Sequence, residues 1–152
     1  ILLGEIRDRE SMEAAMRLAG TGHLVISTLH ANNAPETLDR IINMFPMDQH
    51  RQIFMDLSQY LRAVVSQRLV RSVDGKLVAA VEVMLNTPHL SELINRGDIP
   101  QVKESFSQSS ESGMQTFDHA LLELFKQGKV TMDEALANAD SRSNLEAAIH
   151  FG

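Results

Sequence analysis

The residues best suited to chemistry lie near the start of the chain, where two apolar stretches each end in polar side chains. Glu5 follows the first stretch and a glycine, and Ser27, Thr28 and His30 come at the end of the second. A carboxylate can orient a water molecule for in-line attack on a phosphoryl group. Together with the hydroxyl and imidazole groups, it indicates one wall of a phosphate-hydrolysing site.

Two short, buried strands must carry these groups to the same place. We expect the first strand over residues 1–4 and the second from His23 to Leu29, with a crossover helix from Glu10 to Ala19 between them. Strands joined by such a crossover are parallel, and open α/β sheets bind ligands at the carboxyl ends of their strands. The order of the elements therefore predicts an α/β fold with the polar residues at one edge of a sheet.

Each of these residues also has a purely structural interpretation. Glu5 would then open a solvated turn that continues through Arg7 and Asp8, and His23 and His30 would be partly buried with satisfied hydrogen bonds. The two histidines lie seven positions apart, so they would face opposite sides of a continuous strand. That spacing argues against a shared metal ion, and so against a metal-dependent hydrolase built from both histidines and Glu5.

The sequence contains no loop of the kind that cradles nucleotide phosphates. Such a P-loop needs Gly-x-x-x-x-Gly-Lys followed by Ser or Thr, so that backbone amides and a lysine surround the phosphates. The two Gly-Lys pairs, at residues 75–76 and 128–129, lack the first glycine and are followed by Leu77 and Val130. Since the chain also opens on Ile1, within an expected strand and without an initiator methionine, we expect it to be the carboxyl-terminal part of a longer protein.

The composition is ordinary for a soluble protein. Hydrophobic residues make up 43% of the 152 residues, charged residues make up 22%, and the net charge is −6. Acidic residues outnumber basic ones by 11 to 9 up to Asn95 and by 9 to 5 beyond it, so neither part offers the basic surface that nucleic acid requires. The chain has no cysteine, which excludes disulfides and thiolate metal sites and suits a reducing compartment.

The middle of the chain indicates two helices and a hairpin. The buried face of the first helix would carry Leu38, Ile41 and Ile42. A long amphipathic helix follows from Asp48, with apolar residues stepping by four, four and three at Ile53, Leu57, Leu61 and Val64. Residues 72–76 then form a turn between two β-rich runs, which we expect to extend the sheet antiparallel at its edge.

Beyond residue 88 the pattern changes to helices only. We therefore place a domain boundary at residue 95, which separates residues 1–95 from residues 96–152. Helices are expected at residues 90–95, 99–108, 116–127, 132–139 and 144–150. Capping-box motifs at residues 131–134 and 143–146 would start the last two of them.

The same residues resemble a known family, the type II/IV secretion and pilus ATPases. The resemblance is to their Walker B and His-box region and lies in LLGEIRDRESMEAAMRLAGTGHLVISTLHANNAPETLDRIINMFP. Within that superfamily the chain is most similar to the pilus retraction ATPases, the PilT/PilU group. The similarity continues through VVSQRLV, NTP and GMQTFDHALLELFKQGKVTMDEALANADS.

Two departures indicate the branch within this superfamily. The related extension and secretion ATPases usually carry a four-cysteine zinc module after a segment like Gln67 to Leu69, whereas here residues 71–76 pass directly into the next strand. Retraction ATPases carry an AIRNLI motif where this chain has Thr87 to Ile94, and only the leading Thr-Pro and the Leu-Ile ending remain. The first departure favours the retraction branch, and the second favours a PilU-like member.

The resemblance implies a fold and a site. It implies a partial RecA-like P-loop NTPase core over residues 1–95, with the P-loop half missing, and a small all-helical domain over residues 96–152. Its implied site has Glu5 as the catalytic residue that polarises water, with ATP and Mg²⁺ as cofactors. The implied nucleotide-sensing residues are Thr28, His30 and His23.

The resemblance also implies a cellular role. The parent protein would be a hexameric homo-oligomer that hydrolyses ATP to power type IV pilus retraction and twitching motility. It would be cytoplasmic and peripheral to the inner membrane, with the pilus platform protein of that membrane and a partner retraction ATPase as its partners. We expect this chain to be inactive alone. The alternative is a non-catalytic packing or regulatory module that assembles with an active partner retraction ATPase.

Overall fold

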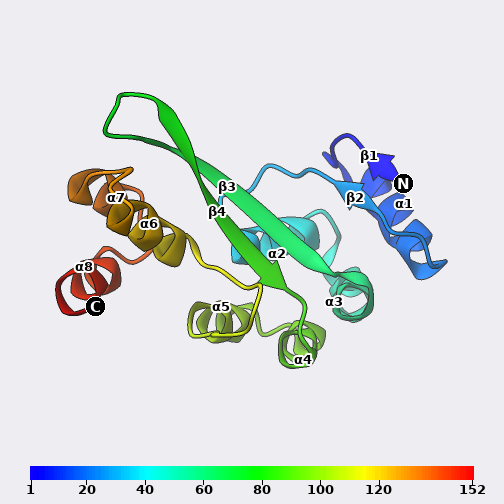
Figure 1. The fold of residues 1–152 in the computed structure, drawn as a ribbon. Helices are drawn as coiled ribbons and strands as arrows, with labels where there is room; N and C mark the ends of the chain where they lie inside the picture. The colour runs from blue at the N-terminus through cyan, green and yellow to red at the C-terminus, as the bar shows by residue number, and fades with distance from the viewer. The chain divides into compact units, whose positions relative to one another are not determined.

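The computed structural model describes all of residues 1–152 and contains eight α-helices, one 3-10 helix and two small sheets (Figure 1). Its internal contacts divide it into two compact units. The first unit comprises residues 1–64 and 85–109, and the second comprises residues 65–84 and 110–152. The mixture of helices and sheets confirms the expected α/β class. None of the helices is long and apolar enough to cross a membrane.

The first unit begins with two short parallel strands and the helix that connects them. These elements are β1 (Leu2–Leu3), α1 (Arg9–Gly20) and β2 (Ile26–Ser27). Asp8 caps α1 by accepting the backbone N–H of Ser11 at 2.8 Å, which satisfies one of the amides left free at a helix start. Figure 1 shows β1 and β2 side by side at the blue end of the ribbon, with α1 beside them. The expected strand, helix and strand are therefore present in the expected order.

Both strands are shorter and more exposed than expected. The second strand has two residues in place of the seven from His23 to Leu29. Leu2 is 77% exposed and Ile26 is 57% exposed, so the prediction of buried strands is wrong. These two residues are register partners and therefore lie on one face of the pair, and no other segment of the chain covers that face.

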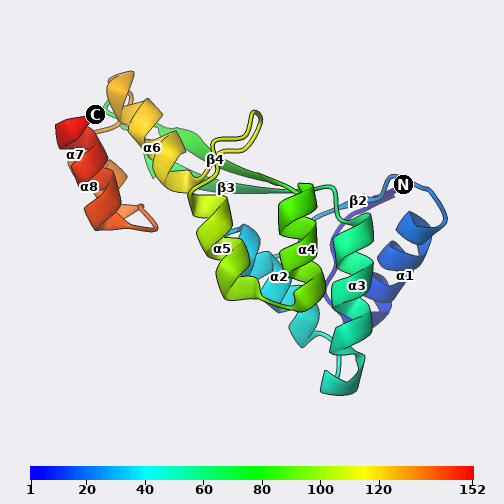
Figure 2. The same cartoon turned by 90° about the horizontal axis from the view of Figure 1, so that it is seen from below.

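Five helical segments complete the first unit. They are α2 (Ala34–Asn43), the 3-10 helix η1 (Met47–Gln49), α3 (His50–Tyr60), α4 (Pro88–Arg96) and α5 (Ile99–Ser107). Helix α3 packs against α1 and α4, and α5 packs against α2 and α4; Figure 2 shows α3, α4 and α5 in a row. Their inward faces supply the core residues Leu38, Ile41, Ile42, Ile53, Leu57, Leu90, Leu93, Ile94 and Val102. The expected buried face of α2 is thus confirmed.

The long helix expected in the middle of the chain stops at Tyr60, before Leu61 and Val64. The backbone at Leu61 is extended, with φ −60° and ψ 133°. The side-chain amide of Asn86 donates to the carbonyls of Ser58 and Leu61, each at 3.0 Å, and so satisfies two carbonyls at the helix end. The apolar spacing could not reveal this stop, because the donor lies 25 positions beyond Leu61.

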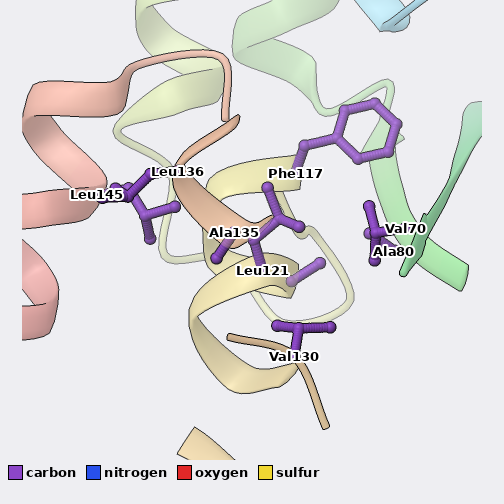
Figure 3. Packing of buried hydrophobic residues seen from close by; sticks show 9 residues of the cluster. Val70, Ala80, Phe117, Leu121, Val130, Ala135, Leu136 and Leu145 are labelled. Carbon is purple, nitrogen blue, oxygen red and sulfur yellow. The ribbon is translucent and has the colours of Figure 1, made fainter. Parts of the chain in front are cut away.

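The second unit combines a hairpin with three helices. Strands β3 (Ala63–Arg71) and β4 (Leu77–Leu85) form a two-stranded sheet across the expected turn, and their residues 65–84 belong to this unit. The helices are α6 (Phe117–Lys126), α7 (Met132–Ala137) and α8 (Arg142–Phe151), and each packs against the other two. Figure 3 shows the core that these elements share, made of Val70, Ala80, Phe117, Ala120, Leu121, Val130, Ala135, Leu136 and Leu145.

Packing divides the chain differently from the change of pattern in the sequence. We expected a boundary at residue 95, but α4 and α5 belong to the first unit, and the hairpin packs with the carboxyl-terminal helices. The hairpin also forms a sheet of its own, so the prediction that it extends the first sheet is wrong. Two of its buried residues, Val70 and Ala80, belong to one apolar cluster with residues of α6, α7 and α8.

The five expected carboxyl-terminal helices are all present, within a few residues of their expected bounds. One capping motif is confirmed in part, because the Thr131 hydroxyl accepts the backbone N–H of Glu134 at 3.2 Å. The Glu134 carboxylate turns instead to the backbone N–H of Arg71, at 2.8 Å. The motif at residues 143–146 does not start a helix, because α8 has already begun at Arg142.

Candidate functional site

The residues expected to form the site follow the carboxyl ends of β1 and β2. The parallel register continues past both strands and brings Gly4 opposite Thr28. The Thr28 hydroxyl donates to the Gly4 carbonyl at 2.7 Å, and the backbone N–H of Ile6 donates to the Thr28 carbonyl at 2.9 Å. These two bonds hold the backbone on both sides of Glu5 against the segment that carries Thr28.

Glu5 and His30 meet at this edge. The His30 Nε2 atom lies 2.9 Å from the Glu5 Oε1 atom. The Glu5 side chain is 22% exposed, whereas the His30 side chain is 82% exposed, so a sheltered carboxylate meets an imidazole that reaches in from solvent. The structure therefore brings together Glu5, Thr28 and His30, as the order of the elements predicted.

Arg7 also belongs to this cluster, although no catalytic role was predicted for it. Its Nε and Nη2 atoms lie 2.7 Å and 2.6 Å from the Glu5 Oε2 atom. Residues two apart in an extended segment share a face, which is the one signal that could have linked Arg7 to Glu5. That signal is weak, because an arginine near a carboxylate is common on any solvated surface.

The neighbours of Glu5, Arg7 above all, favour its charged form. The hydrogen bond from Arg7 is the largest cause that lowers the pKa of the Glu5 carboxyl below its usual value, and the charges of Arg7 and His30 lower it further. Partial desolvation opposes this shift. The same contact raises the pKa of Arg7. Glu5 is therefore a carboxylate at neutral pH, which is the form that can accept a hydrogen bond from water.

A cavity of 320 Å³ opens beside the cluster. It is lined by Leu3, Gly4, Glu5, Glu10, Ser11 and Ala14, from the end of β1 and the first turns of α1. Apart from Gly4 and its two chain neighbours, no residue has a heavy atom within 4 Å of the place where a Cβ on Gly4 would sit, so the Gly4 backbone faces open space there. The arrangement leaves room for a small polar molecule next to the carboxylate.

His23, which was also predicted to belong to the site, lies outside this cluster, and so does the larger of the two cavities. The His23 Nδ1 atom lies 3.1 Å from the Thr21 hydroxyl, at the amino end of β2, whereas Thr28 and His30 follow its carboxyl end. A larger cavity of 460 Å³ lies elsewhere, between α1 and α3, and Glu13, Gly20 and Tyr60 are among its lining residues. The role expected for His23 thus stays a prediction.

The residues present do not form a ligand set for Mg²⁺. Magnesium prefers octahedral coordination by oxygen atoms, usually from one or two carboxylates, waters and substrate phosphates. No group of three or more His, Asp or Glu side chains lies close enough together to hold a metal ion. Both oxygens of Glu5 already contact cationic or potentially cationic nitrogens, those of Arg7 and His30.

Comparison with known proteins gives matches to one group, the secretion and type IV pilus ATPases. The family model for the type II/IV secretion system protein matches residues 1–78. The type IV pilus ATPase PilU of Pseudomonas aeruginosa is 50% identical over 153 aligned positions, which cover 100% of this chain and 40% of the relative. The type IV pilus retraction ATPase PilT of the same organism is 36% identical, over 95% of this chain and 42% of the relative.

The fold matches as well as the sequence. The crystal structure of the pilus retraction motor PilT with bound ADP superposes with a TM-score of 0.85 and 36% identity, over 96% of this chain and 41% of that one. The resemblance to the PilT/PilU group is therefore confirmed. The chain spans about two fifths of the length of these relatives.

Proposed function

Because the chain belongs to the type II/IV secretion system protein family, we propose that it is the carboxyl-terminal part of an ATP-hydrolysing motor that powers type IV pilus retraction. The observation that carries this proposal is the contact between the Glu5 carboxylate and the His30 imidazole at the ends of two parallel strands. The similarity to PilU and PilT supports it.

In this proposal Glu5 orients and polarises the attacking water. Its sheltered, charged carboxylate beside an open cavity suits that task. Thr28 and His30 monitor the γ-phosphate, and the bond from Thr28 to the Gly4 carbonyl would pass a displacement of one segment to the other. His23, which lies at the other end of β2, has support only from the family resemblance.

The remaining parts of the nucleotide site would come from elsewhere in the motor. We propose that a P-loop outside these residues binds the phosphates, since the chain contains no such motif. Magnesium bound with ATP would neutralise charge on the transferring phosphoryl group. Alone, the chain would hold one wall of the site and would not hydrolyse ATP.

The motor would be a hexameric homo-oligomer with a RecA-like core. Residues 1–95 would belong to that core, and residues 96–152 would form its helical carboxyl-terminal part, although α5 packs with the first unit and residues 65–84 pack with the second. It would work at the cytoplasmic face of the inner membrane and engage the pilus platform protein there, together with a partner retraction ATPase. Hydrolysis would move this part of the subunit as a rigid body against its neighbour, and so drive twitching motility.

A second candidate is a non-catalytic packing or regulatory module that assembles with an active retraction ATPase. The observation that favours it is that both oxygens of Glu5 contact nitrogens of its own chain, Oε1 that of His30 and Oε2 those of Arg7. A carboxylate held in this way is a weaker acceptor for water than a free one.

A calorimetric titration with magnesium-ATP tests the proposal. The 152-residue chain is titrated beside the complete protein that contains it. We expect binding only in the complete protein, because only there would a P-loop meet the wall formed by Glu5, Thr28 and His30. Micromolar binding by the chain alone would mean that other groups hold the phosphates, and the proposed division of the site would be wrong.

A further inference from the structure

The two oxygens of Glu5 have different surroundings. Both contacts from Arg7, at 2.6 Å and 2.7 Å, go to Oε2. Oε1 has the single contact from His30, at 2.9 Å. Two nitrogens from one edge of a planar guanidinium group fix the position of Oε2, because the guanidinium cannot rotate about one bond without losing the other.

Arg7 reaches Glu5 from the same short segment of the chain. It lies two residues after Glu5, so no long loop has to be ordered for the contact to form. The bond from the Ile6 N–H to the Thr28 carbonyl, at 2.9 Å, fixes the backbone between the two side chains. The Arg7 side chain is 77% exposed, so it remains accessible and could be replaced without opening a buried cavity.

His30 contrasts with Arg7. It offers one nitrogen, comes from a different segment and is 82% exposed. A single exposed hydrogen bond of this kind exchanges readily with water, since its net contribution to stability is small. The contact at Oε1 is therefore the one that can open, while the contact at Oε2 persists.

Given the proposed function, on which this inference rests, we propose that Arg7 is a positioning residue that anchors Oε2 of Glu5 and leaves Oε1 as the working oxygen. Water takes the place of His30 at Oε1 when the imidazole turns toward phosphate. Arg7 touches neither water nor nucleotide in this scheme. It acts through Glu5, by fixing the orientation and the charge of that carboxylate.

The test is the pH dependence of ATP hydrolysis in the complete protein, with Arg7→Gln, Arg7→Lys and a matched control, Arg9→Gln. Arg9 makes an ion pair with Glu13 of the same length, 2.6 Å, outside the site. We expect Arg7→Gln to lower kcat by roughly 10- to 100-fold, the cost of a misplaced catalytic group, with little change in KM. Arg7→Lys should recover part of this loss, and Arg9→Gln should leave kcat unchanged.

The acid limb of the kcat profile gives a second readout. Glu5 works as a carboxylate, so activity falls as the pH drops through the pKa of its carboxyl group. Arg7 lowers that pKa, and removing it lets the pKa rise. The acid limb of Arg7→Gln should therefore move to higher pH, and the limb of Arg7→Lys should lie between that of Arg7→Gln and that of the unmodified protein. A purely structural role would lower kcat without moving this limb.

The possible outcomes distinguish a failure of the anchoring role of Arg7, called the anchor below, from a failure of the proposed function. If Glu5→Gln abolishes hydrolysis but Arg7→Gln keeps both the kcat and the acid limb of the unmodified protein, the anchor is wrong and the motor stands. If Glu5→Gln leaves hydrolysis intact, both the anchoring role of Arg7 and the proposed catalytic role of Glu5 are wrong. Should Arg7→Gln fail to fold, as circular dichroism would reveal, the acid limb of Arg7→Lys decides, and an unmoved limb overturns the anchor.

Discussion

At the scale of single residues, Glu5 carries the largest share of the proposed chemistry. In the complete protein we expect Glu5→Gln to lower ATP turnover by at least about 100-fold, because an amide cannot polarise water as a carboxylate does. ATP binding, measured by calorimetry, should stay within a factor of about two.

Glu13→Gln is the matched control, since Glu13 pairs only with the exposed Arg9 on α1. It should leave turnover unchanged. Equal turnover in Glu5→Gln and the unmodified protein would remove Glu5 from the mechanism.

Single residues also show the limits of prediction from sequence. Glu5, Thr28 and His30 were identified because the strand, helix and strand pattern places them at one sheet edge. Arg7 was not, because an exposed arginine beside an acid has the same sequence signature whether it anchors a catalytic carboxylate or only solvates a turn. Only the distances to one particular oxygen distinguish the two cases.

At the scale of elements, Arg68 joins β3 to the connection between α7 and α8. Its guanidinium lies 2.6 Å from the Asp140 carboxylate, donates to the Asn138 carbonyl at 2.9 Å, and sits 3.9 Å from the centre of the Phe117 ring. The Arg68 side chain is 22% exposed, so these contacts are partly shielded from water.

We expect Arg68→Met to lower the free energy of unfolding by about 1.5 to 3 kcal/mol, the range for hydrogen bonds to charged groups. Urea denaturation measures this loss. Arg96→Met is the control, because Arg96 pairs with Glu92 on the exposed face of α4 and such pairs contribute roughly 0.3 to 0.5 kcal/mol. Equal losses in the two variants would mean that the Arg68 contacts do not stabilise the second unit.

Two glycines that follow helices allow the effects of backbone strain and of a side-chain clash on stability to be measured separately. Gly97 after α4 has φ +75°, and Gly128 after α6 has φ +71°. A Cβ on Gly97 would lie 2.9 Å from the Phe54 ring, whereas one on Gly128 would meet nothing within 4 Å. The backbone strain of an alanine is thus the same at both sites, and only Gly97 adds a clash.

Gly128→Ala should cost about 1 to 2 kcal/mol of unfolding free energy, the cost of a left-handed backbone with a side chain. Gly97→Ala should cost more, because the Phe54 ring must also move. The comparison is made by urea denaturation of both variants. A smaller loss for Gly97→Ala than for Gly128→Ala would contradict the packing of Phe54 against the turn after α4.

At the scale of the whole molecule, local patterns predicted which elements exist, and packing decided where they end and what they contact. The period of Leu38, Ile41 and Ile42 was enough to identify the buried face of α2. The end of α3 was not predictable, because it depends on Asn86 from a distant segment. The prediction that β1 and β2 are buried failed for the same reason. Burial of a strand depends on whether another segment packs over it, which no local sequence pattern records.

The pairing of Leu2 with Ile26 also has a consequence for the order of folding. The hairpin closes across the five residues of its turn, whereas β1 and β2 can pair only after a chain of more than twenty residues has been brought back on itself. Closing the longer loop costs more entropy, and pairing between distant segments forms slowly. The wall that carries Glu5 and His30 is therefore a non-local product of folding, and slower to assemble than the hairpin that carries none of the proposed chemistry.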